Sequence, residues 1–391
     1  LVGLILGAIL GIAVPQATGI AILGDVFVSA LKAIAPLLVF FLVISSLCNA
    51  GKSHGGVIKT VIILYMFSTV LAAVIAVFAS MAFPVKMTLA NAATDTSAPQ
   101  GIVEVLNNLL LNVVANPVSS LVNANYVGIL MWAVLLGLAF RVADKMTKKV
   151  LADVADGISM VVTWIINLAP FGIFGLVFNT VSTNGLDIFT TYGKLLLLLV
   201  GCMLFIYFVT NPLLVYWCIR QNPYPLIFHC LKRSALTAFF TRSSAANIPV
   251  NMKVCEEMGL DRDTYSVTIP LGATINMDGA AITITVMTMA TAFTLGIHVD
   301  IPTAIILSLL AALSACGASG VAGGSLLLIP MACSLFGISD DISMQVVAVG
   351  FIIGVVQDSV ETALNSSSDL LLSASAEFRQ WRLEGKEIKF K

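Results

Sequence analysis

Long apolar stretches follow one another along this chain, separated by polar segments rich in glycine, proline and small residues. An α-helix needs about 20 predominantly apolar residues to cross a bilayer, and most of these stretches reach that length. The stretch at 103–140 is too long for one crossing and is interrupted by NPVSSLVNANYVG, so we expect it to be broken. The pattern predicts eight spanning helices, near residues 1–14, 21–48, 57–84, 103–140, 150–180, 190–219, 263–295 and 342–375.

Two further apolar regions, 223–258 and 301–336, do not fit as ordinary spans. Each has two apolar arms of roughly 15 residues around a tip of small residues, TRSSAANIPVN in the first and SACGASGVAGGSLLLIP in the second. An arm of that length is too short for a hydrocarbon core of about 30 Å at 1.5 Å per residue. Each region is therefore predicted to be a helical hairpin that enters and leaves on one side of the membrane.

The positions of the basic residues predict how the chain is oriented. Lys and Arg gather in the segments 51–59, 141–149, 220–233, 253–262 and 376–391. Basic residues favour the cytoplasmic side, so both termini and both ends of the first hairpin are expected there. The second hairpin is flanked by His298, Asp300, Asp340 and Asp341 without Lys or Arg, which predicts that it opens outside. Two hairpins of opposite orientation indicate the inverted repeats of a secondary transporter.

Composition supports a membrane protein and narrows the function classes. Of 391 residues, 59% are hydrophobic and 10% are charged, against about 25% charged in a soluble domain. A net charge of −1 without a basic stripe argues against a nucleic-acid partner. Seven irregularly spaced cysteines and three histidines do not predict a metal site or a disulfide framework. The chain opens in LVGLILGAILGIAV, read as a first span cut near its start, so the native N-terminus is expected to be missing.

The last predicted span carries an unusual set of polar residues. Asp358, Thr362, Asn365 and Asp369 are spaced by four, three and four, and Glu361 falls on the same helical face. One charge at a helix centre costs roughly 2.5–3.5 kcal/mol on the insertion scale, so the three carboxylates should face a cavity or a cation. The alternative is a buried polar seam that only holds helices together, but three like charges repel one another.

The segment PLGATINMDGAA at 270–281 has Asn276 and Asp278 between Gly272 and Gly279. A helix unwound here would direct backbone carbonyls, an amide oxygen and a carboxylate at one point. Oxygen ligands without nitrogen or sulfur suit a hard cation. A purely structural hydrogen-bonding role for Asp278 is the alternative.

Three weaker signals accompany these two motifs. The tip TRSSAANIP offers free N–H groups at a helix N-terminus, which favour an anion such as a substrate carboxylate, and its Arg242 brings a cation near the carboxylates. The tip GASGVAGG lets the backbone approach a ligand or bend, unless its small residues only allow close helix packing. Tyr65, Ser68 and Thr69 place three hydroxyl groups on one helical face and, taken alone, are ordinary hydrogen-bonding residues.

Together these motifs resemble the dicarboxylate/amino acid:cation symporter family, over nearly the whole chain and most strongly from 237 to 375. Within the family, the bacterial serine/threonine:sodium symporters are the most similar. The resemblance implies an all-α membrane protein with eight transmembrane helices, two re-entrant helical hairpins, inverted repeats and the elevator mechanism of the glutamate-transporter fold. It implies a homotrimer in the bacterial inner membrane. The scaffold would comprise residues 1–50 and 88–188, and the transport domain 51–87 and 189–391.

The resemblance also implies site residues, with sodium as the coupling ion. The first sodium site would comprise Gly272, Asn276, Asn365 and Asp369. The second would use backbone carbonyls of Thr274, Ala315, Cys316 and Ala318. The third would comprise Tyr65, Ser68, Thr69, Asn276 and Asp278. Asp358 would hold the substrate amino group, and the other expected substrate contacts are Ser243 and Ser244 at the α-carboxylate, Asn365, Glu361, Thr362, Val321 and Gly323.

Two departures from the family pattern bear on the substrate. Acidic-substrate members have Arg where this chain has Glu361, and Thr where it has Ala280. A substrate carboxylate about 4 Å from an ionised Glu361 would be repelled by ~4 kcal/mol at an effective dielectric of 20. A small hydroxyl side chain could instead donate to Glu361. We therefore expect a sodium-driven importer of L-serine and L-threonine without an organic cofactor.

Three alternatives are weighed against that expectation. A sodium- or proton-coupled carrier of dicarboxylates or acidic amino acids conflicts with Glu361. An ion channel could use the same acidic residues, but paired hairpins and one substrate site favour a carrier. A membrane enzyme would need a nucleophile with a nearby base, and none of the three histidines lies in the polar motifs.

Overall fold

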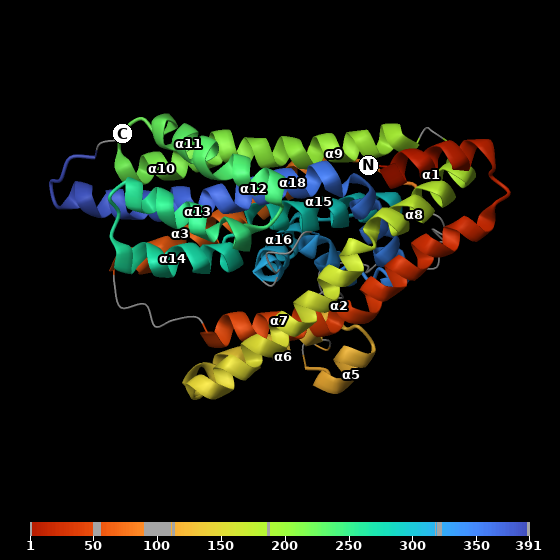
Figure 1. The fold of residues 1–391 in the computed structure, drawn as a ribbon, viewed down its shortest axis with the longest axis horizontal. Helices are drawn as coiled ribbons and strands as arrows, with labels where there is room; N and C mark the ends of the chain where they lie inside the picture. The colour runs from red at the N-terminus through yellow and green to blue at the C-terminus, as the bar shows by residue number, and fades with distance from the viewer. Residues whose placement is uncertain are drawn as a thin grey trace.

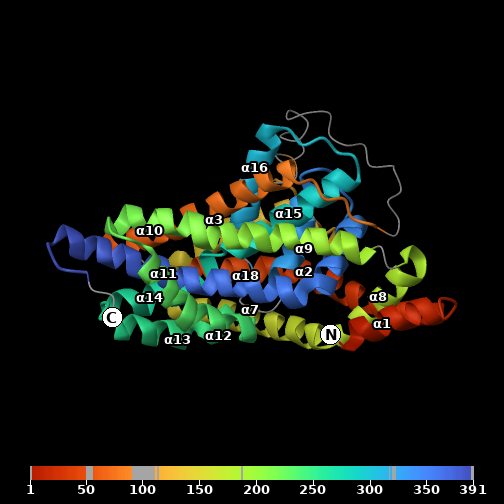
Figure 2. The same ribbon diagram turned by 90° about the horizontal axis from the view of Figure 1, so that it is seen from above.

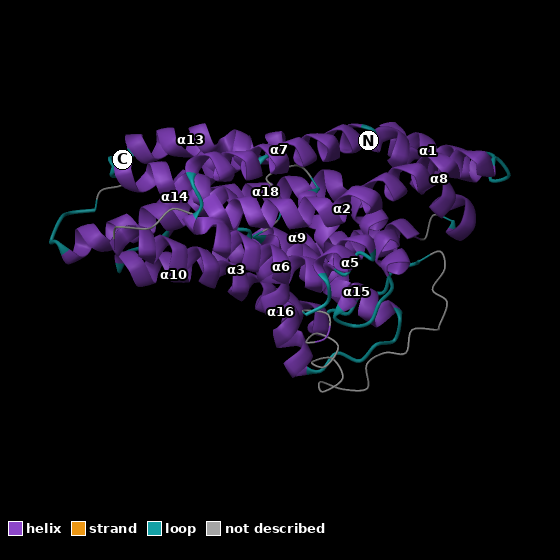
Figure 3. Cartoon of the chain, turned by 90° about the horizontal axis from the view of Figure 1, so that it is seen from below, coloured by secondary structure: helices purple, strands orange, loops and turns teal. Residues whose placement is uncertain are grey.

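The computed structural model describes residues 2–49, 56–89, 111, 114–185, 188–316, 318 and 323–388. Helices make up all the regular structure of this part of the chain (Figure 3). The α-helices are α1 (Val2–Ala13), α2 (Ala21–Asn49), α3 (Gly56–Ala82), α5 (Pro117–Val122), α6 (Tyr126–Ala139), α7 (Lys145–Asn167), α8 (Ala169–Asn184), α9 (Ile188–Phe205), α10 (Asn211–Ile219), α11 (Tyr224–Cys230), α12 (Leu236–Thr241), α13 (Ser244–Glu257), α14 (Arg262–Ile275), α15 (Asp278–Thr294), α16 (Ile301–Ala315), α17 (Ile329–Ser334) and α18 (Asp340–Leu383).

Six helical segments of the described chain are long and apolar enough to cross a membrane. They are Thr18–Asn49, Gly56–Ala82, Lys145–Asn167, Phe189–Ile219, Arg262–Thr294 and Asp340–Leu383. Five of the expected spans therefore appear as long segments, of which Arg262–Thr294 is interrupted between α14 and α15. A sixth, 150–180, is divided at Leu168 into α7 and α8, and Pro170 lies in the first turn of α8. The expected break in 103–140 is present between α5 and α6, where α5 ends at Val122 and Asn125 caps the start of α6.

The longest helix, α18, runs through the middle of the molecule (Figures 1 and 2). Helices α3, α9, α10 and α12 to α15 pack around it. Among the apolar residues of α18, Val355 and Val356 are exposed, whereas Leu370 and Leu371 are fully buried. The reason is that the second half of α18 is enclosed on all sides, so both its polar and its apolar residues are interior.

A second group of helices lies beside this bundle and runs obliquely to α18 in Figure 1. Helix α2 packs against α6, α7 and α8, and α1 lies along α8. Phe27 of α2 meets Phe351 of α18 edge to face, with ring centroids 5.2 Å apart, which joins the two groups.

In both regions predicted to be hairpins, the described residues form two helical arms. In the first, helices α11 and α12 are joined by the π-helical turn Leu231–Ala235, and the chain reverses at Arg242 and Ser243 into α13. Arg242 has φ 50°, and the Ser243 hydroxyl accepts from the Ala246 N–H at 3.2 Å, capping α13. The second hairpin has α16 as its first arm and the 3-10 helix Gly324–Leu328 with α17 as its second.

Candidate functional site

The predicted unwound segment between α14 and α15 is present. The backbone leaves the helical region at Asn276 (φ −99°, ψ 79°) and Met277 (φ −117°, ψ 53°), and α15 starts at Asp278. A carboxylate is favoured there because the first N–H groups of a helix carry partial positive charge. All three residues are buried, Asn276 and Asp278 completely. The break therefore exposes polar backbone and two polar side chains to the interior.

The hydroxyl groups of α3 face this break. Ser68 donates to Asp278 Oδ2 at 2.7 Å, and Thr69 donates to Asp278 Oδ1 at 3.2 Å. The Met277 N–H in turn donates to Thr69 Oγ1 at 3.3 Å. Tyr65 lies one turn earlier and is also fully buried. The structure thus brings together the five residues expected to form the third sodium site, although their role stays a prediction.

Asp369 of α18 lies on the other side of the break. The Asn276 side chain donates to its Oδ1 at 2.9 Å, and the Tyr65 hydroxyl donates to its backbone carbonyl at 2.8 Å. A Cβ at Gly272 would lie 2.8 Å from Asp369 Oδ1, so this close approach requires glycine. Asn365, the fourth residue expected here, instead accepts the Gly279 N–H at 2.7 Å on its Oδ1.

One acceptor at this point has no partner. Asn276 Oδ1 is buried and accepts no hydrogen bond within the described part of the chain. Buried acceptors are almost always satisfied, so an orphan beside two carboxylates, Asp278 and Asp369, marks a place suited to a cation. No group of three His, Cys, Asp or Glu side chains suited to a metal ion occurs among the described residues. The donor set is oxygen only, which fits a hard ion.

The second hairpin approaches the same break. Cys316 Sγ lies 3.6 Å from the carbonyl of Ile275, the residue after Thr274. The Ala318 N–H donates to the Ala315 carbonyl at 2.9 Å. Cys316, which follows the first arm of the second hairpin, therefore lies beside the end of α14, where the helix breaks. Of the expected substrate residues in this hairpin, Val321 lies outside the described residues and Gly323 is buried.

Asp358 lies between the two hairpin tips. Its Oδ1 accepts the Gly323 N–H at 3.2 Å, and its Oδ2 lies 4.0 Å from Arg242 Nη1. Arg242 was expected near the carboxylates, and it is Asp358 that it approaches. Two other expected substrate residues, Ser244 and Thr362, are buried, with 4% and 6% of their surface exposed. Ser243 is only half-buried and caps the start of α13.

Glu361, one turn further along α18, is surrounded by neutral donors. Its Oε2 accepts from Thr283 Oγ1 of α15 at 2.6 Å, from Ser325 Oγ of the second hairpin at 2.9 Å, and from Gln357 Nε2. Gly279 allows α15 to approach this closely, because a Cβ there would lie 2.9 Å from Glu361 Cγ. Sequence reasoning missed all three donors. Only Gln357, four residues before Glu361, carried a signal, since that spacing brings two side chains together on a helix.

A second polar cluster also went unrecognised in the sequence. Asn247 and Asn251 of α13 both donate to the Ser366 hydroxyl, at 2.9 and 3.2 Å, and Asn251 also donates to the Ser366 carbonyl at 2.9 Å. These bonds tie the second arm of the first hairpin to α18. The signal was available, because two asparagines four residues apart share one helical face.

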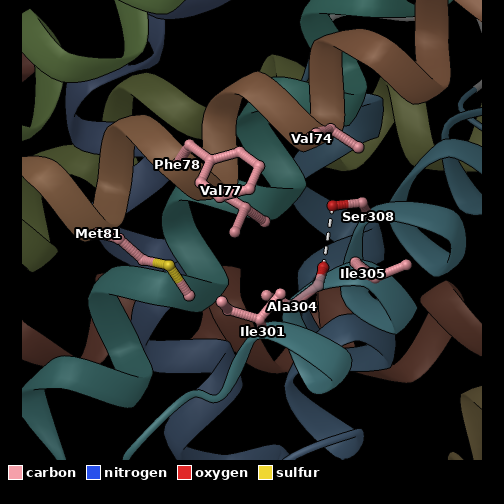
Figure 4. Close-up of a pocket in the computed structure, with 8 residues that line it drawn as sticks. All are labelled: Val74, Val77, Phe78, Met81, Ile301, Ala304, Ile305 and Ser308. Atoms are coloured by element: carbon pink, nitrogen blue, oxygen red, sulfur yellow. Dashed lines mark hydrogen bonds between the residues drawn. The ribbon is translucent and has the colours of Figure 1, made fainter.

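A pocket elsewhere in the molecule is apolar and separate from these groups. Figure 4 shows it between α3 and α16, lined by apolar side chains such as Phe78 and Ile305. Its one polar side chain, Ser308, donates to the Ala304 carbonyl of its own helix at 2.9 Å. This apolar pocket therefore takes no part in the polar cluster around the α14–α15 break.

Comparison with known proteins shows which proteins this chain is similar to. The model of the sodium:dicarboxylate symporter family matches residues 1–377. The serine/threonine transporter SstT of Bifidobacterium adolescentis is 58% identical over 389 residues, covering 99% of this chain and 90% of that protein. The proteins of the same name from Streptococcus thermophilus and Streptococcus agalactiae are 56% and 58% identical, covering 97% and 96% of this chain and 95% and 94% of their own lengths.

Proposed function

Since this chain belongs to the sodium:dicarboxylate symporter family, we propose that it imports L-serine and L-threonine together with sodium. It is a multi-pass membrane transporter and not an enzyme. The observation that carries the proposal is the buried, oxygen-only cluster at the break between α14 and α15, where Asp278, Asp369 and the orphan Asn276 Oδ1 converge.

Sodium is the proposed coupling ion, taken up as cargo with the amino acid. Asp278, Ser68 and Thr69 are proposed to hold one ion, and Asp369, Asn276 and Gly272 another. The remaining proposed ligands are Tyr65, Asn365 and the carbonyls of Thr274, Ala315, Cys316 and Ala318. Two buried carboxylates with no basic partner in hydrogen-bonding range among the described residues support this assignment, because an uncompensated buried charge is costly.

The proposed substrate site lies between the hairpin tips. Asp358 would take the amino group and Glu361 the side-chain hydroxyl, from neighbouring turns whose side chains share one face. Serine and threonine carry these two groups on adjacent carbons. Ser243, Ser244, Thr362, Asn365, Val321 and Gly323 are the other proposed contacts.

The name of the family also includes dicarboxylates as substrates. The position of Glu361 makes a dicarboxylate an unfavourable substrate for this chain. The Glu361 carboxylate is buried and meets only neutral donors among the described residues. A second carboxylate on the substrate would be repelled by about 4 kcal/mol at 4 Å in an effective dielectric of 20. The relatives are named serine/threonine transporters, which also favours serine and threonine over dicarboxylates as substrates.

The finer architecture is also part of the proposal. We propose eight spans and two re-entrant hairpins arranged as inverted repeats, in a homotrimer of the bacterial inner membrane with both termini cytoplasmic. Residues 1–50 and 88–188 would form the scaffold, and 51–87 and 189–391 a transport domain that moves as an elevator. Helix α2 packs mainly with α6, α7 and α8, and these helices form a group separate from the one around α18. This grouping supports the division into a scaffold and a transport domain.

Uptake into proteoliposomes tests the function directly. Radiolabelled serine should accumulate when an inward sodium gradient is imposed, because the proposed ion ligands are oxygen atoms suited to sodium. With potassium on both sides and a proton gradient alone, no accumulation is expected. Accumulation under that proton gradient would overturn sodium coupling, and uptake of aspartate without uptake of serine would overturn the substrate assignment.

Ser68→Ala should weaken sodium coupling moderately. The variant removes one hydroxyl from Asp278, and the loss of one hydrogen bond to a charged group, about 1.5–3 kcal/mol, corresponds to an increase of roughly 10-fold or more in the sodium concentration for half-maximal uptake. Ser80→Ala is the matched control, because Ser80 lies on the same helix, is similarly buried and donates to the Ala76 carbonyl of its own helix. Equal sodium dependence in the two variants would contradict the assignment of Ser68.

A further inference from the structure

The three donors around Glu361 come from three separate elements. Thr283 belongs to α15, Ser325 to the second arm of the second hairpin, and Gln357 to α18 itself. Thr283 and Gln357 are fully buried, and Ser325 is 2% exposed. All three bonds end on the same oxygen, Oε2. Buried donors that converge on one atom hold a side chain in one orientation.

The orientation of the Gln357 amide follows from this geometry. Its Nε2 lies within bonding distance of Glu361 Oε2 and 2.7 Å from Thr283 Oγ1. Thr283 gives its single hydroxyl proton to Glu361, so it can only accept from Gln357. Turning the amide over would place its oxygen, an acceptor, against the carboxylate oxygen of Glu361 and leave no donor for Thr283 Oγ1 to accept from. Gln357 Oε1 is consequently left buried without a hydrogen-bond partner in the described structure.

Glu361 therefore has one occupied oxygen and one available oxygen. No described residue donates to Oε1, whereas Oε2 receives all three bonds. A carboxylate free to rotate would offer either oxygen to a ligand. With Oε2 held by the protein, only Oε1 can accept from a substrate hydroxyl. An amino acid without a hydroxyl would leave Oε1 dehydrated and unpaired, which is unfavourable.

We infer that Thr283, Ser325 and Gln357 are positioning residues that make Glu361 select amino acids with a side-chain hydroxyl. The inference rests on the proposed function and extends it from Glu361 to its three donors. Each donor fixes the carboxylate so that Oε1 alone meets the substrate. Substrate specificity would also depend on the position of the second hairpin, because the Ser325 hydroxyl donates to Glu361 from that hairpin.

The test is competition between serine and alanine for uptake of radiolabelled serine in proteoliposomes. Thr283→Val and Ser325→Ala should each lower the preference for serine over alanine by about 3- to 10-fold, the value of one hydrogen bond. Alanine inhibition should change much less. Thr283→Ser keeps the hydroxyl and should restore most of the preference. The two residues lie on different elements. If the Thr283→Val protein does not fold, the Ser325→Ala protein still tests whether the donors to Glu361 set the serine preference.

Matched controls and a double variant separate positioning from simple structural damage. Thr285→Val makes the same change two residues along α15, at a buried hydroxyl without a hydrogen-bond partner among the described residues, and should keep the preference. In a Glu361→Gln background, Thr283→Val should have no further effect on the preference, since residues acting through one group are not additive. Equal losses for serine and alanine, or full additivity in the double variant, would overturn the inference. Absence of serine uptake in the unaltered protein would instead overturn the proposed function.

Discussion

Glu361→Arg should abolish serine uptake, with a loss of more than about 100-fold. The substitution removes the acceptor for the substrate hydroxyl, worth roughly 1.5–3 kcal/mol. It also places a guanidinium one turn from Asp358, where the two side chains would pair and compete with the substrate amino group. The first effect weakens binding of the substrate hydroxyl and the second weakens binding of its amino group. Their free-energy costs combine, so the loss of serine uptake should exceed that from either effect alone.

Uptake of serine and aspartate by purified Glu361→Arg, reconstituted in parallel with Glu361→Gln, measures this effect. Glu361→Gln should keep transport but shrink the preference for serine over alanine by about 10- to 150-fold, because it loses the charge and keeps the shape. Aspartate uptake by the Arg variant would be a gain that misfolding cannot produce. Serine uptake by Glu361→Arg within about threefold of the unaltered protein would exclude Glu361 from the substrate site.

Part of the fold and the site followed from local sequence patterns. The polar spacing at 358–369 predicts one helical face, and all its members are buried on α18. The sequence INMDG predicts an interrupted helix, and the backbone leaves the helical region at Asn276 and Met277. Both are local features, since spacing and helix-breaking residues act within a few residues of the chain. The helical arms of both predicted hairpins were predicted for the same reason.

Other features depend on contacts between distant parts of the chain. The bond from Ser325 to Glu361 joins residues 36 apart, and that from Thr283 joins residues 78 apart. Neither residue differs in type from the many buried serines and threonines of this chain, so no local pattern marks it. The burial of Leu370 and Leu371 likewise depends on how many helices surround α18. The engagement of Asn365 with the Gly279 N–H depends on the approach of α15, which Gly279 permits.

Asp369→Asn should raise the sodium concentration for half-maximal uptake by about 10- to 100-fold and change serine affinity at saturating sodium much less. Asp369 lies three turns along α18 from Asp358, beside Asn276 at the helix break. The substitution keeps the size of the side chain but removes a negative charge from a buried, oxygen-lined position. A cation held there loses direct electrostatic attraction, and changes at ion sites commonly reach this size.

Sodium titrations of serine uptake, followed by serine titrations at the highest sodium concentration, separate the two effects. Asp156→Asn is a suitable control, because Asp156 is an exposed carboxylate on α7 and its change should leave both curves unaltered. The Asn276 amide donates to Asp369 and would face a neutral amide in the variant. An unchanged sodium curve with lost serine binding would place Asp369 in the substrate site instead.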